Sequence, residues 1–275
     1  MSNQSKIWDS YEYLKPTIIS RFSSYLDNLK QTNRGRKRTV DLEIFFKAFY
    51  SNVRDGTSPS NFKYYFGLPK STYFDYLSHL KNSDIFTTLN HEITSSYSLK
   101  SVLGGDSFTV KSYTGSEGVG RSSTGRNGIK VQILSDLKGV VYSLETAPAN
   151  KHDSRIFVDY LSKEKEKLIN YGNRVILLDS AYIGNPVKDA AKLVNLRTLT
   201  VPKKKRNGQP THTLDDKQKT KIKQRWRIEQ QIGVFRRFYV YGKAINSKFV
   251  RHIKTYDFFL SFAITLINNY HIVME

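Results

Sequence analysis

The sequence predicts an α/β protein, a mixed sheet with flanking helices, preceded by a small all-α region. The main observation is a change of period. Apolar residues recur every three or four positions before residue 95, whereas runs of strand length alternate with helical patterns beyond residue 102. A second observation is the continuous apolar run at residues 174–178, which suits a central, parallel-paired strand. We therefore expect one domain over residues 1–95 and another over residues 96–275, with a polar linker near residues 89–100.

The first region carries the spacing of amphipathic helices. Residues 8–29 fit one helical pattern, but Pro16 lies inside it. Because proline removes a backbone donor, we expect two short helices or a kinked one. Residues 41–53 form a second amphipathic pattern, with Thr39 or Asp41 as its N-cap.

A third helical pattern covers residues 69–80 and follows a break that contains Gly67. Helices separated by a glycine-containing turn are typical of a helix-turn-helix, whose second helix enters the major groove of DNA. A small helical bundle used for protein contacts gives the same pattern, and the sequence leaves both interpretations open. On the first interpretation, the recognition helix begins with four candidate DNA contacts, Lys70, Ser71, Thr72 and Tyr73.

The second region alternates strands and helices. Strands are predicted at residues 102–110, 128–135, 140–146, 174–178 and 196–202, and residues 136–139 form a hairpin turn. Helices are predicted at residues 153–171, 186–194, 213–239 and 256–270. This order of elements indicates a mixed sheet covered on its faces by helices.

The composition points to an anionic partner. The 275 residues include 44 Lys and Arg against 24 Asp and Glu, a formal net charge of +20. An excess of this size favours a polyanion, because phosphate neutralisation releases counterions. The absence of cysteine excludes a disulfide framework, a thiol nucleophile and a Cys-ligated metal. Residues 1–15 lack the apolar segment of a signal peptide, and the apolar stretch at 258–267 is too short to cross a bilayer, so we expect no secretion and no membrane contact.

Three acids stand out from their surroundings: Asp106 within a strand, Asp179 at the end of the most apolar strand, and Glu229 in a cationic helical segment. A carboxylate at the C-terminal end of a central strand lies where α/β sheets bind ligands. Three such carboxylates repel one another unless divalent cations bind, and Mg²⁺ prefers carboxylate and phosphate oxygens. Simpler interpretations stay open, since Asp179 could cap a helix and Glu229 could form an ion pair. Asp136 is a rival first acid in the hairpin turn, and we expect Asp153 at the surface.

The charge excess is concentrated late in the chain. Residues 203–254 contain 16 Lys and Arg and three Asp and Glu, a net charge of +13 in 52 residues. A solvated helix face mixes both signs, so this segment favours an anionic ligand. Trp226 either stacks on a base or fills the core, and we expect the core. The candidate DNA contacts are Lys203, Lys204, Lys205, Arg206, Arg225, Arg227, Arg236 and Arg237.

The order of these residues resembles a known family. Arg225 stands four residues before Glu229 and Arg236 seven after it. This is similar to the signature Tyr, two residues, Arg, three residues, Glu, six residues, Lys of DDE transposases of the insertion sequence 4 and 5 superfamily and the related Harbinger-type group. The chain departs from it at Ile222, in place of Tyr, and at Arg236, in place of Lys. Asp179, followed by Ser, Ala and Tyr, resembles the second motif of the family, and the resemblance covers about residues 100–270.

The resemblance implies an RNase H-like catalytic domain and the activity of a DNA transposase. Such an enzyme binds terminal inverted repeats, cleaves phosphodiesters and joins the freed 3′-OH ends to target DNA. Asp106, Asp179 and Glu229 would hold two Mg²⁺, for which Mn²⁺ can substitute, and Arg225 and Arg236 would lie near phosphates. The partners would be the element ends and target DNA, bound by a homodimer or a higher assembly. The transposase would be located in the bacterial cytoplasm at the nucleoid, or in the nucleus of a eukaryote.

Two other functions fit the same residues. One is a catalytically silent, domesticated DNA-binding protein, and the other is an RNase H-like nuclease without strand transfer. The complete set of three acids, together with Arg225, favours the transposase over the first. A strand-transfer assay separates it from the second.

Overall fold

The structure is a computed structural model that describes residues 3–30, 40–98, 102–112, 118–122, 125, 127–169, 174–204, 206, 208–240, 243–244 and 253–274. The chain divides into two units, Met1–Ser96 with Val234–Glu275, and Tyr97–Gly233. The boundary between the units at Ser96 and Tyr97 lies near the expected boundary at residues 95 and 96. The segment after residue 233 departs from the expected division, because its long helix packs within the first unit.

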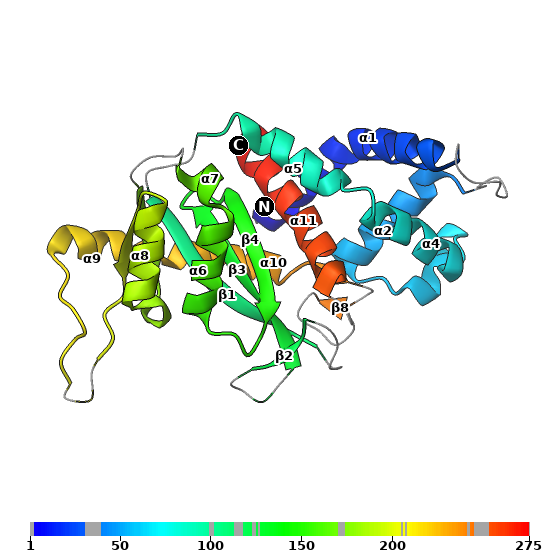
Figure 1. The fold of residues 1–275 in the computed structure, drawn as a ribbon. Helices are drawn as coiled ribbons and strands as arrows, with labels where there is room; N and C mark the ends of the chain where they lie inside the picture. The colour runs from blue at the N-terminus through cyan, green and yellow to red at the C-terminus, as the bar shows by residue number, and fades with distance from the viewer. Residues whose placement is uncertain are drawn as a thin grey trace. The chain divides into compact units, whose positions relative to one another are not determined.

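The described part of the first unit is mostly helical (Figure 1). Its helices are α1 (Asn3–Lys30), α2 (Leu42–Asp55), α3 (Phe62–Phe66), α4 (Lys70–Lys81), α5 (Ile85–Ser95) and α11 (Ile253–Asn269). The 3₁₀ turn η1 (Pro59–Asn61) precedes α3, and the π-helical turn η3 (Tyr270–Met274) follows α11. Two short strands, β7 (Tyr239–Val240) and β8 (Lys243–Ala244), pair with each other.

Helix α1 runs through Pro16 as one helix, so the alternative of two separate short helices is wrong. The same apolar stripe is buried on both sides of the proline, with Tyr11 and Leu14 before it and Ile18 and Phe22 after it. A proline inside a helix costs about 3 kcal/mol. Burying a large apolar side chain contributes about 1.5–3 kcal/mol, so the stripe outweighs the lost hydrogen bond.

The segment expected as a linker is largely helix α5, which is a correction to the sequence-based prediction. Its polar residues made it look like a connection, but its apolar face packs on α11. Thr265 of α11 donates a hydrogen bond to the Phe86 carbonyl at 2.9 Å, and the Asn268 amide donates to Asn90 Oδ1 at 2.8 Å. Polar residues therefore serve the helix–helix contact here.

Helices α2 to α4 occupy the segment predicted as a helix-turn-helix. Asp41 caps α2 as expected, since its carboxylate accepts the Glu43 amide at 2.9 Å. Helix α3 ends at Gly67, whose φ of 67° is a left-handed conformation that glycine adopts without strain. Helix α4 then begins at Lys70, within one residue of the predicted start.

The second unit is built on a mixed sheet, as predicted. Its strands are β1 (Val102–Lys111), β2 (Gly120–Arg121), β3 (Asn127–Asp136), β4 (Val141–Pro148), β5 (Arg174–Leu178) and β6 (Leu196–Thr200). The long strand β1 is central, antiparallel to β3 on one side and parallel to β5 on the other. Strand β4 pairs with β3 to form the predicted hairpin, and β6 continues the parallel half.

Helices cover both faces of this sheet (Figure 1). One face packs on α6 (Asp153–Lys163), α7 (Lys165–Ile169) and α8 (Asn185–Leu193) through a core that includes Leu103, Ile176 and Leu178. Gly104 lies on the opposite face, where Ile228 of α10 (Trp226–Phe235) contacts it. Because side chains alternate along a strand, Asp106 points to the α10 face as well.

The single helix expected over residues 213–239 is two helices, α9 (Asp216–Lys223) and α10, which meet at Gln224 and Arg225. All residues of α9 are described and none is buried, whereas α10 buries Ile228, Ile232 and Phe235. An apolar stripe that would hold one continuous helix on the sheet is therefore missing from its first half.

No helix in the described part of the chain is long and apolar enough to cross a membrane.

Candidate active site

Asp106 lies near the middle of β1 and is partly buried. Its Oδ1 accepts the amide of Ser107 at 2.8 Å, and its Oδ2 accepts Nη1 of Arg225 at 2.9 Å. The Asp106 carboxylate is thus held between the strand backbone and a guanidinium that comes from the junction of α9 and α10.

Asp179 directly follows β5, which pairs in parallel with β1. It caps the 3₁₀ turn η2 (Ser180–Tyr182), with Oδ1 accepting the Ser180 amide at 2.6 Å. The capping interpretation and the catalytic one are compatible, because the same carboxylate also lies near enough to Asp106 to raise its pKa. The sheet therefore brings together two acids that are far apart in the sequence.

Glu229 lies in the first turn of α10 and is largely exposed. Its Oε1 accepts Nη2 of Arg225 at 2.5 Å, so the ion pair expected from their spacing is observed. Arg225, whose side chain is 17% exposed, therefore bridges Glu229 and Asp106. In this structure one guanidinium compensates the charge of both carboxylates.

The electrostatics of Asp106 disfavour its charged form, even with Arg225 beside it. Burial raises the pKa of Asp106, and the nearby charge of Asp179 raises it further. Hydrogen bonds from the Ser107 amide and from Arg225 lower the pKa, but they do not offset burial. A group of carboxylates at this position gains most from a bound positive charge.

Helix α10 is fixed on the sheet by three contacts that position Glu229. A Cβ on Gly104 would lie 2.1 Å from Cδ1 of Ile228, so only glycine allows the helix to sit this close to β1. Arg227 Nη1 donates to the Leu137 carbonyl at 3.1 Å, and Gln231 Nε2 donates to the Asp136 carbonyl at 3.2 Å. These two side chains, one turn apart, attach α10 to the β3–β4 turn.

Asp136, the rival first acid, is a structural turn residue. It is fully buried, and its Oδ1 accepts the amides of Lys138, Gly139 and Val140 at 2.9–3.1 Å. Its Oδ2 accepts the hydroxyl of Tyr97 at 2.5 Å. A carboxylate with these donors is satisfied by the turn itself.

A buried network beside the acids was not predicted. Gln132 of β3 is 1% exposed, accepts the Tyr182 hydroxyl at 2.7 Å and donates to the Asp106 carbonyl at 3.0 Å. Since Tyr182 ends the turn that Asp179 caps, this glutamine ties the Asp179 turn to the Asp106 strand. A glutamine between the apolar residues Val131 and Ile133 was the available signal.

A second network corrects the expectation that Asp153 is a plain surface residue. Its Oδ1 accepts the Ser107 hydroxyl at 2.5 Å and pairs with Lys130 Nζ at 3.0 Å. Its side chain is 24% exposed. The residue after Asp106 is therefore anchored to the start of α6, which adds support to the Asp106 strand.

The acids suit a divalent metal by their chemistry. Among the described residues, no three His, Asp or Glu side chains are grouped closely enough to hold a metal ion. Asp106 and Asp179 are near each other, and Glu229 shares a guanidinium with Asp106. The donors are carboxylate oxygens, the ligands of Mg²⁺ and Mn²⁺. In the structure, Arg225 supplies the positive charge that compensates Asp106 and Glu229. The residues therefore fit a metal ion that would replace Arg225 in this role.

The late cations are exposed. Lys203, Lys204 and Arg206 lie in the connection after β6, which folds back through a hydrogen bond from the Thr211 amide to the Lys203 carbonyl at 2.8 Å. Lys205 lies outside the described residues. The structure therefore leaves the three described cations of this connection accessible to a ligand.

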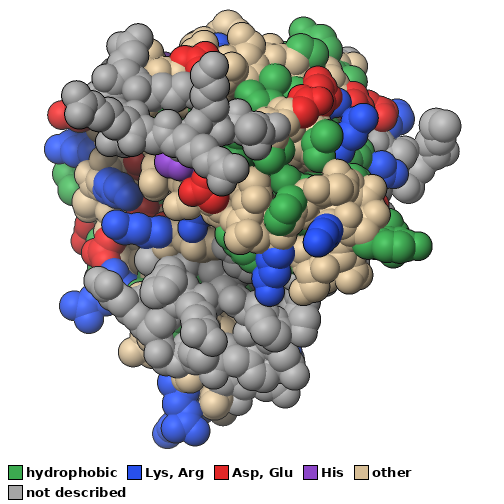
Figure 2. Space-filling model, turned by 90° about the vertical axis from the view of Figure 1, so that its right-hand side faces the viewer, with side chains coloured by type: hydrophobic (Ala, Val, Ile, Leu, Met, Phe, Trp, Pro, Cys, Tyr) green, Lys and Arg blue, Asp and Glu red, His purple; other side chains and the backbone are tan. Residues whose placement is uncertain are grey.

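Three further candidates lie on or beside α10. Arg236 and Arg237 are exposed just after its last residue, and Arg227 is exposed as well. Trp226 is 52% exposed, with the Arg227 guanidinium 6.0 Å from its ring centre, so the expectation of a core position is wrong. On the face drawn in Figure 2, the Lys and Arg side chains of described residues lie in several groups, with Asp and Glu between them.

One of the predicted recognition-helix contacts is wrong. Lys70 and Ser71 are exposed and Thr72 is half-buried, but Tyr73 is fully buried. Its ring packs against Phe62 at 4.6 Å between centroids, and its hydroxyl donates to Asn52 at 3.3 Å. Tyr73, one helical turn after Pro69, therefore points into the core of the α2–α4 segment and cannot contact DNA from there.

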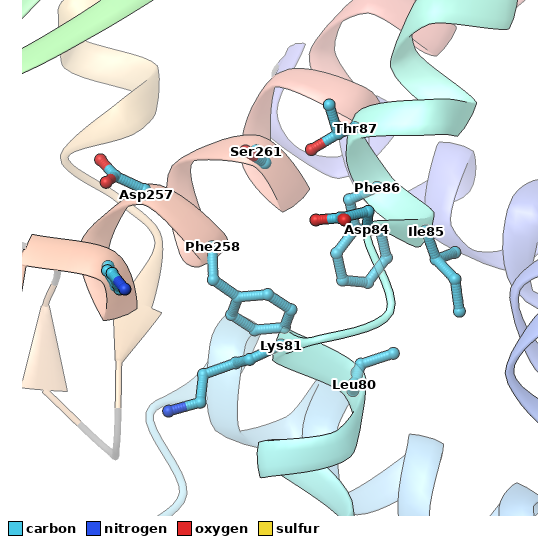
Figure 3. Close-up of a pocket in the computed structure, with 10 residues that line it drawn as sticks. Leu80, Lys81, Asp84, Ile85, Phe86, Thr87, Asp257, Phe258 and Ser261 are labelled. Atoms are coloured by element: carbon cyan, nitrogen blue, oxygen red, sulfur yellow. The ribbon is translucent and has the colours of Figure 1, made fainter. Parts of the chain in front are cut away.

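The first unit has a cavity of about 240 Å³ between the α4–α5 turn and α11 (Figure 3). Its lining carries both signs of charge, from Lys81 and Lys254 and from Asp84 and Asp257. Burial lowers the pKa of Lys81. None of the three candidate catalytic acids lines this cavity, so it is separate from the site on the sheet.

Comparisons with known proteins agree with the topology. A family model described as "Transposase DDE domain" matches residues 98–266. A piggyBac transposase synaptic complex with hairpin DNA is similar with a TM-score of 0.58 and 11% identity, over 98% of this chain and 74% of that chain. A Mos1 transposase paired-end complex is similar over 61% of this chain and 60% of that one, with a TM-score of 0.27 and 13% identity. No curated protein sequence matches the chain. The likeness to the piggyBac structure, at 11% identity, concerns the fold.

Proposed function

Because the chain belongs to the transposase DDE domain family, we propose that it is a DNA transposase that binds terminal inverted repeats, cleaves DNA phosphodiesters and joins the freed 3′-OH ends to target DNA. One observation carries this proposal. Asp106 on β1 and Glu229 on α10 share the guanidinium of Arg225, and Asp179 at the end of β5 lies close enough to Asp106 to change its pKa.

Asp106, Asp179 and Glu229 would hold two Mg²⁺, or Mn²⁺, which when bound would activate the attacking oxygen and stabilise the leaving oxygen. Each acid comes from a different element, so the site depends on how these elements are held. Gly104 lets α10 approach the strand that carries Asp106, and Gln132 links that strand to the Asp179 turn. These residues would hold in place the elements that carry Asp106, Asp179 and Glu229.

Arg225 would act at two stages. In the structure its guanidinium neutralises Asp106 and Glu229. Once those carboxylates have another cation, the guanidinium can direct its donors to a phosphodiester, for which its planar fork is well suited. Arg225 would thereby bring the scissile phosphate toward the acids.

Double-stranded DNA is the proposed partner, both as element ends and as target. The net charge of +20 supports a polyanionic ligand, and the exposed cations after β6 and around α10 supply the contacts. The piggyBac structure is a synaptic complex with hairpin DNA. By analogy, a homodimer or a higher assembly would pair two element ends.

The test is a cleavage and joining assay on a duplex that contains the inverted repeats flanking the coding sequence. We expect wild-type protein with Mg²⁺ or Mn²⁺ to cut at the repeat end and to join that end to a target plasmid. The Asp179→Ala variant should do neither, whereas Asp189→Ala, an exposed acid on α8, should do both. Full activity of Asp179→Ala would refute the catalytic assignment.

The same assay separates the two alternatives. Cutting without joining would indicate a nuclease of this fold. Repeat binding without cutting in either metal would indicate a DNA-binding protein without catalysis.

A further inference from the structure

A second concave region lies on the catalytic unit, between the parallel strands β5 and β6 and helix α9. We call it the β6–α9 pocket and define it by Val175, Arg197, Leu199, Asp215, Lys217 and Lys221. Its volume is about 320 Å³. Val175 and Leu199 form an apolar floor, and charged side chains form the walls, so the pocket suits a ligand with both sugar and anionic surfaces.

The pocket opens on the face of the sheet to which Asp106 points. In the parallel ladders, Gly104 of β1 pairs with Leu177 of β5, and Leu177 pairs with Leu199 of β6. Paired residues of neighbouring strands point to one face, and so do residues two apart. Since Gly104 faces α10, Asp106 and Arg197 face the same side. Strand β6 lies two strands from β1, which is roughly 10 Å at the usual strand spacing.

The charges of the pocket are unbalanced. Arg197, Lys217 and Lys221 are exposed, and none of the three pairs with a carboxylate among the described residues. The one acid in the lining, Asp215, is engaged in capping α9, where it accepts the Gln218 amide at 2.7 Å. By contrast, Lys219 on another side of α9 pairs with Asp216 at 2.9 Å.

This arrangement is unfavourable unless an anion binds. Lys217 and Lys221 are one helical turn apart, and like charges at that spacing repel. Helix α9 buries no side chain that would offset the repulsion. Phosphate oxygens would neutralise all three cations, with Arg197 able to form a bidentate contact.

We propose that the β6–α9 pocket binds the phosphate backbone of duplex DNA beside the catalytic acids. This inference rests on the proposed function, since it takes the ligand of the neighbouring site to be DNA. Phosphates along one strand of a duplex recur every 3.4 Å of helix axis. A duplex that reaches Asp106 therefore presents several phosphates within the roughly 10 Å that separates β1 from β6. Contacts of this kind position the duplex and carry no sequence information.

The test is the salt dependence of binding to a duplex of arbitrary sequence without divalent metal. The test variant combines Arg197→Gln, Lys217→Gln and Lys221→Gln. The matched control removes three exposed lysines from the helices of the opposite face, Lys165→Gln, Lys188→Gln and Lys192→Gln, which form no ion pair with any residue that the structure describes. Both variants change the net charge equally, so a non-specific effect of charge appears in both.

We expect the slope of log K against log salt to be smaller by about 2.7 in the test variant, since each lost phosphate contact contributes about 0.9. The control should keep a slope within about 1 of wild type. Thermal unfolding shows whether each variant is folded. If the triple variant does not fold, Lys221→Gln is compared with Lys188→Gln, and the expected reduction is about 0.9 for the first only.

The outcomes distinguish the inference from the proposed function. If wild type binds and the test and control variants have equal slopes, the pocket is refuted while the transposase proposal stands. If wild-type protein binds neither this duplex nor the flanking repeats, both are refuted.

Discussion

Replacing Gly104 with alanine tests how the site is assembled, because Gly104 is the point where α10 rests on β1. The added Cβ would lie 2.1 Å from Cδ1 and 2.3 Å from Cγ1 of Ile228. Carbon atoms in contact normally lie about 3.5–4.0 Å apart. Ile228 is fully buried, so a shift of roughly 1 Å or more has to be taken up by its rotamer or by the helix.

The expected magnitude follows from overpacking. An extra methyl in a close-packed core costs about 1–3 kcal/mol. For a chain of this size, such a loss lowers Tm by roughly 2–12 °C. Helix α10 carries Glu229 and follows Arg225 directly, and a misplacement of about 1 Å can reduce a rate about 100-fold. We therefore expect Gly104→Ala to reduce single-turnover cleavage by about that factor at a temperature where the protein is folded.

Gly105→Ala is the control, because its Cβ would meet Leu178 Cδ2 at 2.8 Å on the other face of the sheet. It should lower Tm without a comparable loss of cleavage. In the Gly104→Ala/Ile228→Ala double variant, the Cβ of residue 104 would lie 3.7 Å from the Cβ of residue 228, which is an ordinary contact. Alanine at position 104 should therefore lower the free energy of unfolding less in the Ile228→Ala background than in the wild-type background. Wild-type stability and wild-type cleavage in Gly104→Ala would refute the reasoning.

Two further predictions concern Asp106 and the network beside it. Tyr182→Phe leaves Gln132 Oε1 without its buried hydrogen-bond donor. We expect the free energy of unfolding in urea to fall by about 1–3 kcal/mol and Mn²⁺ to bind more weakly. An unchanged Mn²⁺ affinity would show that the network does not position the acids. Burial raises the pKa of Asp106 above its ordinary value of 3.8, so the metal-free folded chain retains a proton that the unfolded chain has lost. Its stability should therefore fall as the pH rises from about 4 through that raised pKa, and Asp106→Asn should remove this part of the fall. An identical pH profile in the variant would contradict the burial of this carboxyl.

The sequence predicts the sheet well because strand signals were local. The apolar run of β5 matched its observed bounds, and the turn residues placed the β3–β4 hairpin. Asp179 could be placed at a strand end for the same reason. Local patterns do not show which element packs on each face. The helix α5 and the burial of Tyr73 were therefore missed, and the choice between one and two helices around Pro16 stayed open.

The contacts that hold the candidate site together are long-range. Arg225 reaches Asp106 across 119 positions, and Gln132 reaches Tyr182 across 50. A glycine pair in a strand shows that something approaches closely, but it does not say that Ile228 does. The β6–α9 pocket likewise depends on Arg197 and Lys221 meeting on one face, which only the register of β5 and β6 provides.

We propose that Asp106, Asp179 and Glu229 together hold the metal ions that cut DNA. Counting bound Mn²⁺ by electron paramagnetic resonance, on the complex with a duplex carrying the flanking repeats, tests it most directly. We expect two ions in wild type and in the exposed-acid control Asp189→Asn, and fewer than two in Asp179→Asn. Two ions bound by Asp179→Asn with wild-type affinity would contradict it.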